Sequence, residues 1–171
     1  MTISGSIDAI GVSGRYWIGG NEQGAYDLLV NSLLQAKSSI RIVAYSLGDR
    51  SGELDRIFGI LREKINTGVR VQLIINRFWT ITGYAQKQLK ELEHRNFKLF
   101  NYEPQDEREN LHAKIIIVDS TEILLGSANI SKSGLFSNHE IVIKISGGEF
   151  ASRVNSLVNV LAKNIFQDEK K

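Results

Sequence analysis

The chain has 171 residues, of which 42% are hydrophobic and 23% are charged, an ordinary composition for a globular protein. It contains no cysteine, which excludes a disulfide framework and any cysteine-ligated zinc or iron–sulfur site and is typical of a reducing compartment. The net charge of +2 is too small to indicate a constitutive polyanion binder, so any recognition of phosphate must be local.

The sequence carries no recognisable targeting or membrane segment. Its first residues lack the positive region and apolar run of a secretory signal peptide. No apolar run reaches the roughly 18 residues that a transmembrane helix needs. We therefore expect a cytoplasmic protein without stable membrane association. We also expect one catalytic domain over residues 1–171, with a frayed tail at 167–171.

Helical and strand patterns alternate regularly up to about residue 102. Apolar residues at helical spacing predict three helices, over 22–37, 51–68 and 84–95. Short apolar runs between them predict buried strands over 39–46, 69–76 and 97–102. Alternation of this kind implies parallel strands that are joined by helical crossovers.

The pattern changes after residue 110. Three strands with short connections are predicted over 112–119, 122–127 and 139–146, and they are expected to pair antiparallel. A closing amphipathic helix is predicted over 148–166. The whole pattern predicts an α/β fold with a mixed, mainly parallel β-sheet sandwiched between helices.

The connection at 103–110 contains the only proline of the chain and four acidic residues. Two interpretations are open for it. It is either a solvated connection or a gate that keeps other anions away from the strand that follows.

Polar residues gather where these last strands begin and end. Because strand side chains alternate between faces, His112 and Lys114 are expected on one face and Asp119 on the other. Ser127 and Asn129 share a parity at the end of the next strand. A tight hairpin through 119–122 would bring them level with His112.

The residue types in this patch suit the chemistry of a phosphodiester. An imidazole such as His112 can attack phosphorus or protonate a leaving oxygen. The ammonium of Lys114 and neutral donors suit the phosphoryl oxygens, and the carboxylate of Glu140 can orient an imidazole. No carboxylate cluster accompanies them to hold magnesium, so we expect neither a metal nor a cofactor.

The order of these residues strongly resembles the HKD signature of the phospholipase D superfamily. The matching positions are His112-x-Lys114-x4-Asp119, then Gly126-Ser127-x-Asn129, then Asn138-x-Glu140. The resemblance covers most of the chain and implies a phospholipase D-like fold. It also implies roles: His112 as nucleophile, Lys114 and Asn129 on the nonbridging oxygens, Ser127 in the same pocket, Glu140 orienting His112, and Asp119 and Gly126 as structural residues.

The mechanism of this family uses two histidines, whereas the chain has one HKD copy. Neither His94 nor His139 has a lysine two residues further on. Short single-copy members resolve this by forming a homodimer, so the resemblance implies a C2 dimer with one composite active centre. One histidine must then attack while the other donates a proton, which predicts a bell-shaped pH–rate profile.

Two arginine–aromatic clusters, at 14–21 and 76–80, have two interpretations each. They either stack bases and contact phosphate, or pack in the core and the dimer interface. Arg77 and Trp79 are the better candidates for substrate binding, because they follow a predicted parallel strand. Lys132 either contacts a neighbouring phosphate or is a solvated loop lysine.

The resulting prediction is a metal-independent nuclease, similar to the short endonuclease branch of the superfamily. A phospholipid hydrolase of the phospholipase D type and a catalytically idle nucleic-acid-binding dimer are the alternatives. DNA and RNA, single- and double-stranded, all remain open as substrates. Because no reading helix is evident, sequence specificity would have to come from a partner protein.

Overall fold

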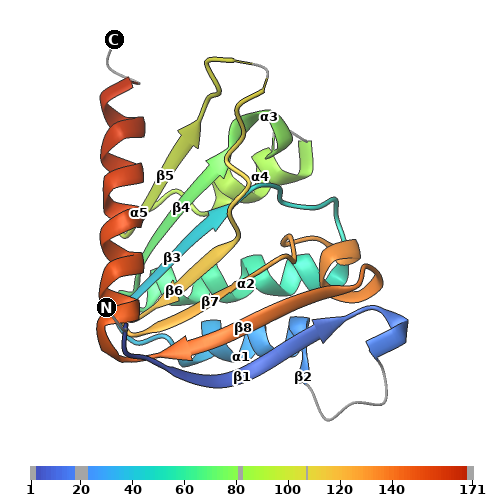
Figure 1. The fold of residues 1–171 in the computed structure, drawn as a ribbon. Coiled ribbons are helices and arrows are strands. Elements are labelled where there is room, and N and C mark those ends of the chain that lie inside the picture. Colours follow the sequence, from blue (N-terminus) through green and yellow to red (C-terminus); the bar gives the residue numbers. More distant parts are fainter. Residues whose placement is uncertain (1–2, 18–22, 81–82, 107, 169–171) are drawn as a thin grey trace.

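The computed structural model describes residues 3–17, 23–80, 83–106 and 108–168, which are organised around one eight-stranded sheet (Figure 1). The strand order is β2-β1-β8-β7-β6-β3-β4-β5. The strands are β1 Ser6–Ser13, β2 Gln23–Gly24, β3 Ser39–Ala44, β4 Arg70–Asn76, β5 Phe97–Tyr102, β6 Ile115–Val118, β7 Glu122–Gly126 and β8 Glu140–Ser146.

Helices cover both faces of this sheet (Figure 1). The helical elements are η1 Arg15–Trp17, α1 Ala25–Gln35, α2 Gly52–Asn66, α3 Arg77–Thr80, α4 Gly83–Glu91, the π-helical turn η2 Ser133–Ser137 and α5 Gly148–Asp168. One buried cluster lies under α1, α2 and α4, and a second lies under α5. Among the described helices, none combines the length and the apolar character needed to cross a membrane.

Strand alternation divides the side chains of β3 between the two clusters. Ile40 and Ile42 belong to the cluster under α1 and α2, and Val43 belongs to the cluster under α5. Arg41 shares the parity of Val43 and contacts α5 through Asn155. The strand is therefore apolar on both faces except at Ser39 and Arg41.

The predicted mixed α/β class with helices on both faces is confirmed, but the sheet is less parallel than expected. Three pairings of the described strands are parallel, β1–β2, β3–β4 and β4–β5. Four are antiparallel, β1–β8, β3–β6, β6–β7 and β7–β8. The excess comes from β6, which pairs antiparallel with both β3 and β7. Strand β1, which the sequence pattern did not reveal because most of its residues are exposed or half-buried, adds one pairing of each kind.

Several predicted helix boundaries differ from the observed ones. Helix α1 begins at Ala25, and Gln23–Gly24 pair as β2 instead of opening the helix. Helix α4 ends at Glu91, four residues before the predicted end. Helix α5 continues to Asp168, so residues 167 and 168 are helical, whereas 169–171 of the expected tail lie outside the described residues.

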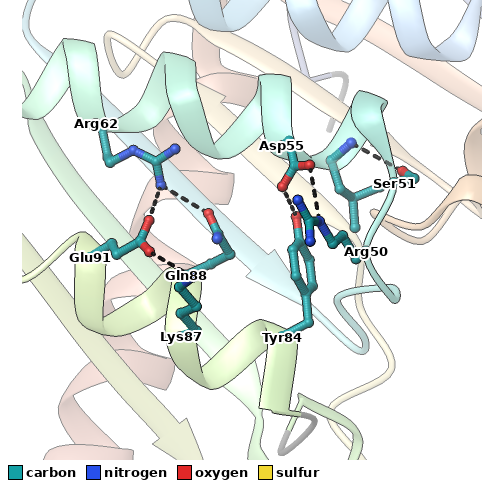
Figure 2. Close-up of polar contacts among 9 residues, drawn as sticks. Arg50, Ser51, Asp55, Arg62, Tyr84, Lys87, Gln88 and Glu91 are labelled. Atoms are coloured by element: carbon teal, nitrogen blue, oxygen red, sulfur yellow. Dashed lines mark hydrogen bonds and ion pairs between the residues drawn. The ribbon is translucent and has the colours of Figure 1, made fainter.

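Polar contacts fasten α4 to α2, as Figure 2 shows. The Arg62 guanidinium donates to the side chains of Gln88 and Glu91, each at 2.9 Å. The Tyr84 hydroxyl donates to the Asp55 carboxylate at 3.1 Å, and burial together with this carboxylate raises the pKa of Tyr84 to about 12. These contacts fix the crossover between β4 and β5 against the helical layer.

Candidate active site

The candidate catalytic residues lie at one edge of the sheet, just beyond a row of paired apolar residues. Val43, Ile115, Leu125 and Ile143 are partners in turn across β3, β6, β7 and β8. The carboxyl end of β3 and the amino end of β6 therefore meet at this edge, and β7 ends where β8 begins. The residues of the HKD signature lie at this end of the strands or in the loops that leave it, with Gly126 closing β7 and Glu140 opening β8; Asp119 is the exception and lies at the opposite end of β6.

His112 and Lys114 precede strand β6, which corrects the prediction that they lie within a strand from 112. The pairing of β6 with β3 and with β7 stops at Ile115, although β3 and β7 each continue one residue further, to Ala44 and Gly126. The segment 112–114 forms no strand pair with either of them. It is therefore free to turn the imidazole of His112, which is exposed, toward solvent.

Lys114 and the imidazole of His112 are in direct contact. The Lys114 ammonium lies 3.1 Å from Nδ1 and 3.2 Å from Nε2 of His112, and it donates to the His112 carbonyl oxygen at 2.7 Å. The Tyr45 ring lies 4.5 Å from the His112 ring, centroid to centroid. It also lies 5.0 Å from the Lys114 nitrogen, within the range of a cation–π contact.

Tyr45 was missed by the sequence analysis. It follows β3 directly, at the carboxyl end of a parallel strand, which is where ligands tend to collect in α/β sheets. That position was the available signal, although the pairing of β3 with β6 is needed to place Tyr45 beside His112.

Burial lowers the pKa of Lys114, and the negative charge of Glu140 opposes part of this effect. The two side chains therefore interact electrostatically across β7. Among the described residues, the hydrogen-bond partner of the Glu140 carboxylate is the Asn138 amide, at 3.3 Å, and not His112. The site thus combines a cation with a nearby carboxylate at an open edge.

Gly126 and Ser127 hold the end of β7 close to β8. The Ser127 N–H donates to the Ile141 carbonyl at 3.0 Å, and the Ser127 hydroxyl accepts from the Ile141 N–H at 3.2 Å. A Cβ atom on Gly126 would lie 2.0 Å from the same Ile141 carbonyl oxygen. Only glycine permits this approach.

Asn129 follows this tight segment and carries an unusual feature. Its Oδ1 atom is buried and has no hydrogen-bond partner among the described residues. A buried acceptor without a partner costs about 1–3 kcal/mol, and such atoms gather at functional sites. A Cβ atom on Gly134 would lie 2.5 Å from the Asn129 carbonyl oxygen, so a second glycine allows η2 to pack on this residue.

Asp119 has contacts of a structural kind. Its carboxylate accepts from the backbone N–H groups of Lys37, Ser38 and Ser39 and from the Ser38 hydroxyl, at 2.7–3.2 Å. Burial raises the pKa of Asp119, but these hydrogen bonds outweigh it and hold the pKa below its ordinary value. The residue fastens the turn after β6 to the loop between α1 and β3.

The residues predicted for substrate binding are not joined to His112 or Lys114 by any contact among the described residues. Arg77 forms an ion pair with Glu103 of the acidic connection at 103–110. Trp79 lies in α3, but its side chain is outside the described part of the structure. Lys132 is exposed beside η2. The pKa of Glu53 is lowered mainly by backbone and Ser51 hydrogen bonds, and the charge of Lys132 adds a smaller effect in the same direction.

The other two histidines are engaged elsewhere. The ring of His139 stacks on Tyr16 with centroids 5.0 Å apart, and its Nε2 accepts from the Tyr16 N–H. The Nδ1 of His94 accepts from the Asn96 N–H. Of the cluster at 14–21, residues 18–21 lie outside the described residues. Within the described residues, no group of three or more metal-ligating side chains comes together.

Comparison with known proteins gives one curated relative and several solved structures. The chain is 26% identical over 132 residues to the DISARM protein DrmC of Bacillus paralicheniformis; the match covers 77% of this chain and 54% of the relative, so the chain spans about half of that protein. Nuc from Salmonella typhimurium, described as a phospholipase D family member, superposes with a TM-score of 0.72 at 21% identity, covering 94% of this chain and 95% of Nuc. NucT from Helicobacter pylori superposes with a TM-score of 0.71 at 19% identity, covering 97% of both chains.

A domain family described as "Cardiolipin synthase, PLD-like domain" matches residues 29–161, which is most of the chain and includes every position of the HKD signature. The structural likeness to Nuc and NucT extends the same fold to the residues on either side of this range. The chain therefore belongs to the phospholipase D-like family.

Proposed function

We propose that this protein is a metal-independent phosphodiesterase that cleaves nucleic acid through a covalent phosphohistidine at His112. The observation that carries the proposal is the contact between His112 and Lys114. An exposed imidazole lies 3.1 Å from an ammonium group at an open edge of the sheet. This pairing places a nucleophile beside a cation that suits a phosphoryl oxygen.

The reaction proceeds in two displacements. In the first, a ring nitrogen of His112 attacks phosphorus, an N–P bond forms, and the bond from phosphorus to the leaving oxygen breaks. The leaving oxygen takes a proton from a second histidine. In the second, that histidine removes a proton from water, the water oxygen bonds to phosphorus, and the N–P bond breaks.

The remaining signature residues have supporting roles in this scheme. Lys114 neutralises a nonbridging oxygen. Asn129 lies next to the same edge, and its amide can donate to another nonbridging oxygen. Glu140, whose charge already acts on Lys114, is the group that orients an imidazole when the site is complete.

The second histidine comes from another copy of the chain. The chain has three histidines, and His94 and His139 have the other contacts described above. A C2 dimer that brings two His112 side chains to one phosphate supplies the nucleophile and the acid from identical residues. The rate then requires one neutral and one protonated imidazole, which gives a bell-shaped pH–rate profile.

Nucleic acid is favoured over phospholipid by the structural likeness to Nuc and NucT, two nucleases whose fold covers more than nine-tenths of this chain. Phospholipid remains the second candidate, because the family description names cardiolipin synthase and α5 exposes Leu157 and Val160.

The test is digestion in EDTA of labelled single- and double-stranded DNA, RNA and phospholipid vesicles. His112→Ala is compared with His94→Ala, which removes an exposed histidine outside the site. We expect nucleic acid to be cut by the unaltered protein and by His94→Ala, and not by His112→Ala. Hydrolysis of lipid alone would show that the proposed substrate is wrong. Equal activity of the two variants would show that the proposed role of His112 is wrong.

A further inference from the structure

Four cations gather at the end of the sheet that is opposite His112. Arg41 lies on β3, Arg70 opens β4, and Arg95 and Lys98 lie at the start of β5. The strand register brings them together: Arg41 pairs with Gln72, which pairs with Lys98, and Ser39 pairs with Arg70 in the next row. Three of the cations therefore stand on the α5 face at the amino ends of β3, β4 and β5.

Two adjoining cavities open over these residues. One, of about 330 Å³, is lined by all four cations, and the other, of about 430 Å³, runs along the first turns of α5. They share Arg41, Ser120 and Asn159 and so form one channel, which we call the amino-end groove. The groove lies over the first turns of α5 and the amino ends of β3 and β4. Figure 1 shows these segments close together, at the tails of the β3 and β4 arrows.

The charge of this groove is uncompensated. Among the described residues, neither cavity is lined by an aspartate or a glutamate, and no ion pair joins any of the four cations to a described carboxylate. The chain as a whole has 19 acidic and 21 basic residues. A groove of four cations without an acid is therefore a marked local asymmetry in a nearly neutral protein.

For Arg41, the lack of a carboxylate partner carries a free-energy cost. Its guanidinium is partly buried, and its partners are neutral: Oε1 of Gln72 at 2.6 Å, and the side-chain and backbone oxygens of Asn155 at 3.3 and 3.4 Å. Burial lowers the pKa of Arg41, but arginine stays charged at neutral pH. A partly buried cation held by neutral acceptors is stabilised when an external anion approaches it.

We propose that the amino-end groove binds the phosphate backbone of a nucleic-acid chain, as a second contact remote from the His112 site. Four positive charges exceed what one monophosphate needs, and they suit a run of phosphodiesters with one negative charge each. Neutral donors such as Ser120 and Asn159 complete the surface for phosphate oxygens. The proposal rests on the proposed function for the identity of its ligand.

The position of the groove fits one chain that reaches both places. From Arg41 to Tyr45, strand β3 advances four residues, which corresponds to about 13 Å. Because Val43 between them is buried under α5, a nucleic-acid strand that reaches both places passes around this helix and spans more than about four nucleotides at about 3.4 Å each. The groove thus holds substrate on one side of the scissile phosphate without taking part in the reaction.

The test uses two triple variants in the His112→Ala background, so that ligand is bound and not cut. Arg70→Ala/Arg95→Ala/Lys98→Ala removes three exposed cations of the groove. Arg56→Ala/Lys87→Ala/Lys163→Ala removes three exposed cations elsewhere and is the control of equal charge. Binding of a fluorescent oligonucleotide is followed by anisotropy over a series of salt concentrations, with circular dichroism to confirm folding.

We expect the groove variant to bind about tenfold more weakly at about 0.1 M salt, with a salt slope smaller by about 2, since each contact on a single strand contributes about 0.7. The control variant should change both quantities much less. Equal behaviour of the two variants would overturn the proposal. The proposal would also be overturned if inorganic phosphate, at constant ionic strength, bound to the groove while the oligonucleotide affinity was the same in both variants, because the groove would then hold a single anion and not a nucleic-acid backbone.

A second measurement separates this proposal from the proposed function. With His112 restored, hydrolysis of bis(4-nitrophenyl) phosphate, which is too small to reach the groove, should be the same in the groove variant as in the unaltered protein. A loss of this activity in the groove variant would contradict a remote site. If the unaltered protein does not hydrolyse the reporter, the proposed function fails, whereas the binding comparison still decides the groove.

Discussion

Asp119 shows how one carboxylate can hold two distant segments together. It receives three backbone N–H groups of the loop before β3 although it lies some eighty residues away. Its position after β6 also requires a positive φ of 51°, a conformation that non-glycine residues adopt rarely. The hydrogen bonds offset this strain and make Asp119 a structural member of the signature.

We predict that Asp119→Asn destabilises the protein by about 1–2 kcal/mol at pH 7, because hydrogen bonds to a charged acceptor become bonds to a neutral one. The folded-state pKa of Asp119 lies below its unfolded value of about 3.9, so this stabilisation is present above about pH 4 and is lost as the pH falls through the folded pKa. Urea unfolding at several pH values measures it.

The control for this prediction is Asp49→Asn, which neutralises an exposed aspartate in a loop. Its stability should follow that of the unaltered protein at every pH. A gap between the Asp119 variant and the unaltered protein that stays constant from pH 7 to pH 3 would show that the ionised carboxylate is not the source of the stabilisation.

Gly126 is the second residue whose role is set by a close contact. We predict that Gly126→Ala costs about 1–3 kcal/mol and lowers activity, because a methyl group would collide with the Ile141 backbone and move Ser127 and Asn129. Gly59→Ala is the matched control: Gly59 lies inside α2 with nothing within 4 Å of its added Cβ, and it should gain about 0.5–1 kcal/mol. Thermal unfolding of both variants measures these changes. An equal loss of stability in Gly126→Ala and Gly59→Ala would contradict the prediction.

At the scale of elements, the sequence predicts the parts that local patterns determine. The strands and helices between 39 and 102, with the short helix α3 excepted, follow from apolar periodicity and from caps such as Ser51, whose hydroxyl accepts from the Leu54 N–H. Strand β1 follows from no such pattern. Its pairing with β8 joins residues more than 120 positions apart, so it depends on tertiary structure.

The candidate site shows the same division. The signature predicts which residues meet, since its spacing is a property of the sequence, and the structure brings them to one edge of the sheet, with Asp119 excepted. The signature does not predict that His112 precedes strand β6 or that Tyr45 packs on His112. Both depend on where β3 ends relative to β6, which is a matter of register between segments some seventy residues apart.

At the scale of the whole molecule, the account predicts a dimer in which each active centre needs both copies of His112. Sedimentation equilibrium at catalytic concentrations should give twice the chain mass of 19.2 kDa. After equal amounts of the unaltered protein and His112→Ala are mixed and allowed to exchange subunits, the activity should be about a quarter of that of the same total amount of unaltered protein, because only unaltered dimers are complete. A remainder of about a half would indicate independent subunits.

The phosphohistidine at His112 is the central claim, and trapping it tests that claim most directly. The protein is mixed in EDTA with an internally ³²P-labelled oligonucleotide, quenched within one turnover in alkaline denaturant, and separated by gel electrophoresis. We predict label that stays on the protein in alkali, is released by acid, maps to the peptide containing His112, and is absent from His112→Ala. Cleavage of the oligonucleotide without any labelled protein, or with label on another residue, would contradict the account.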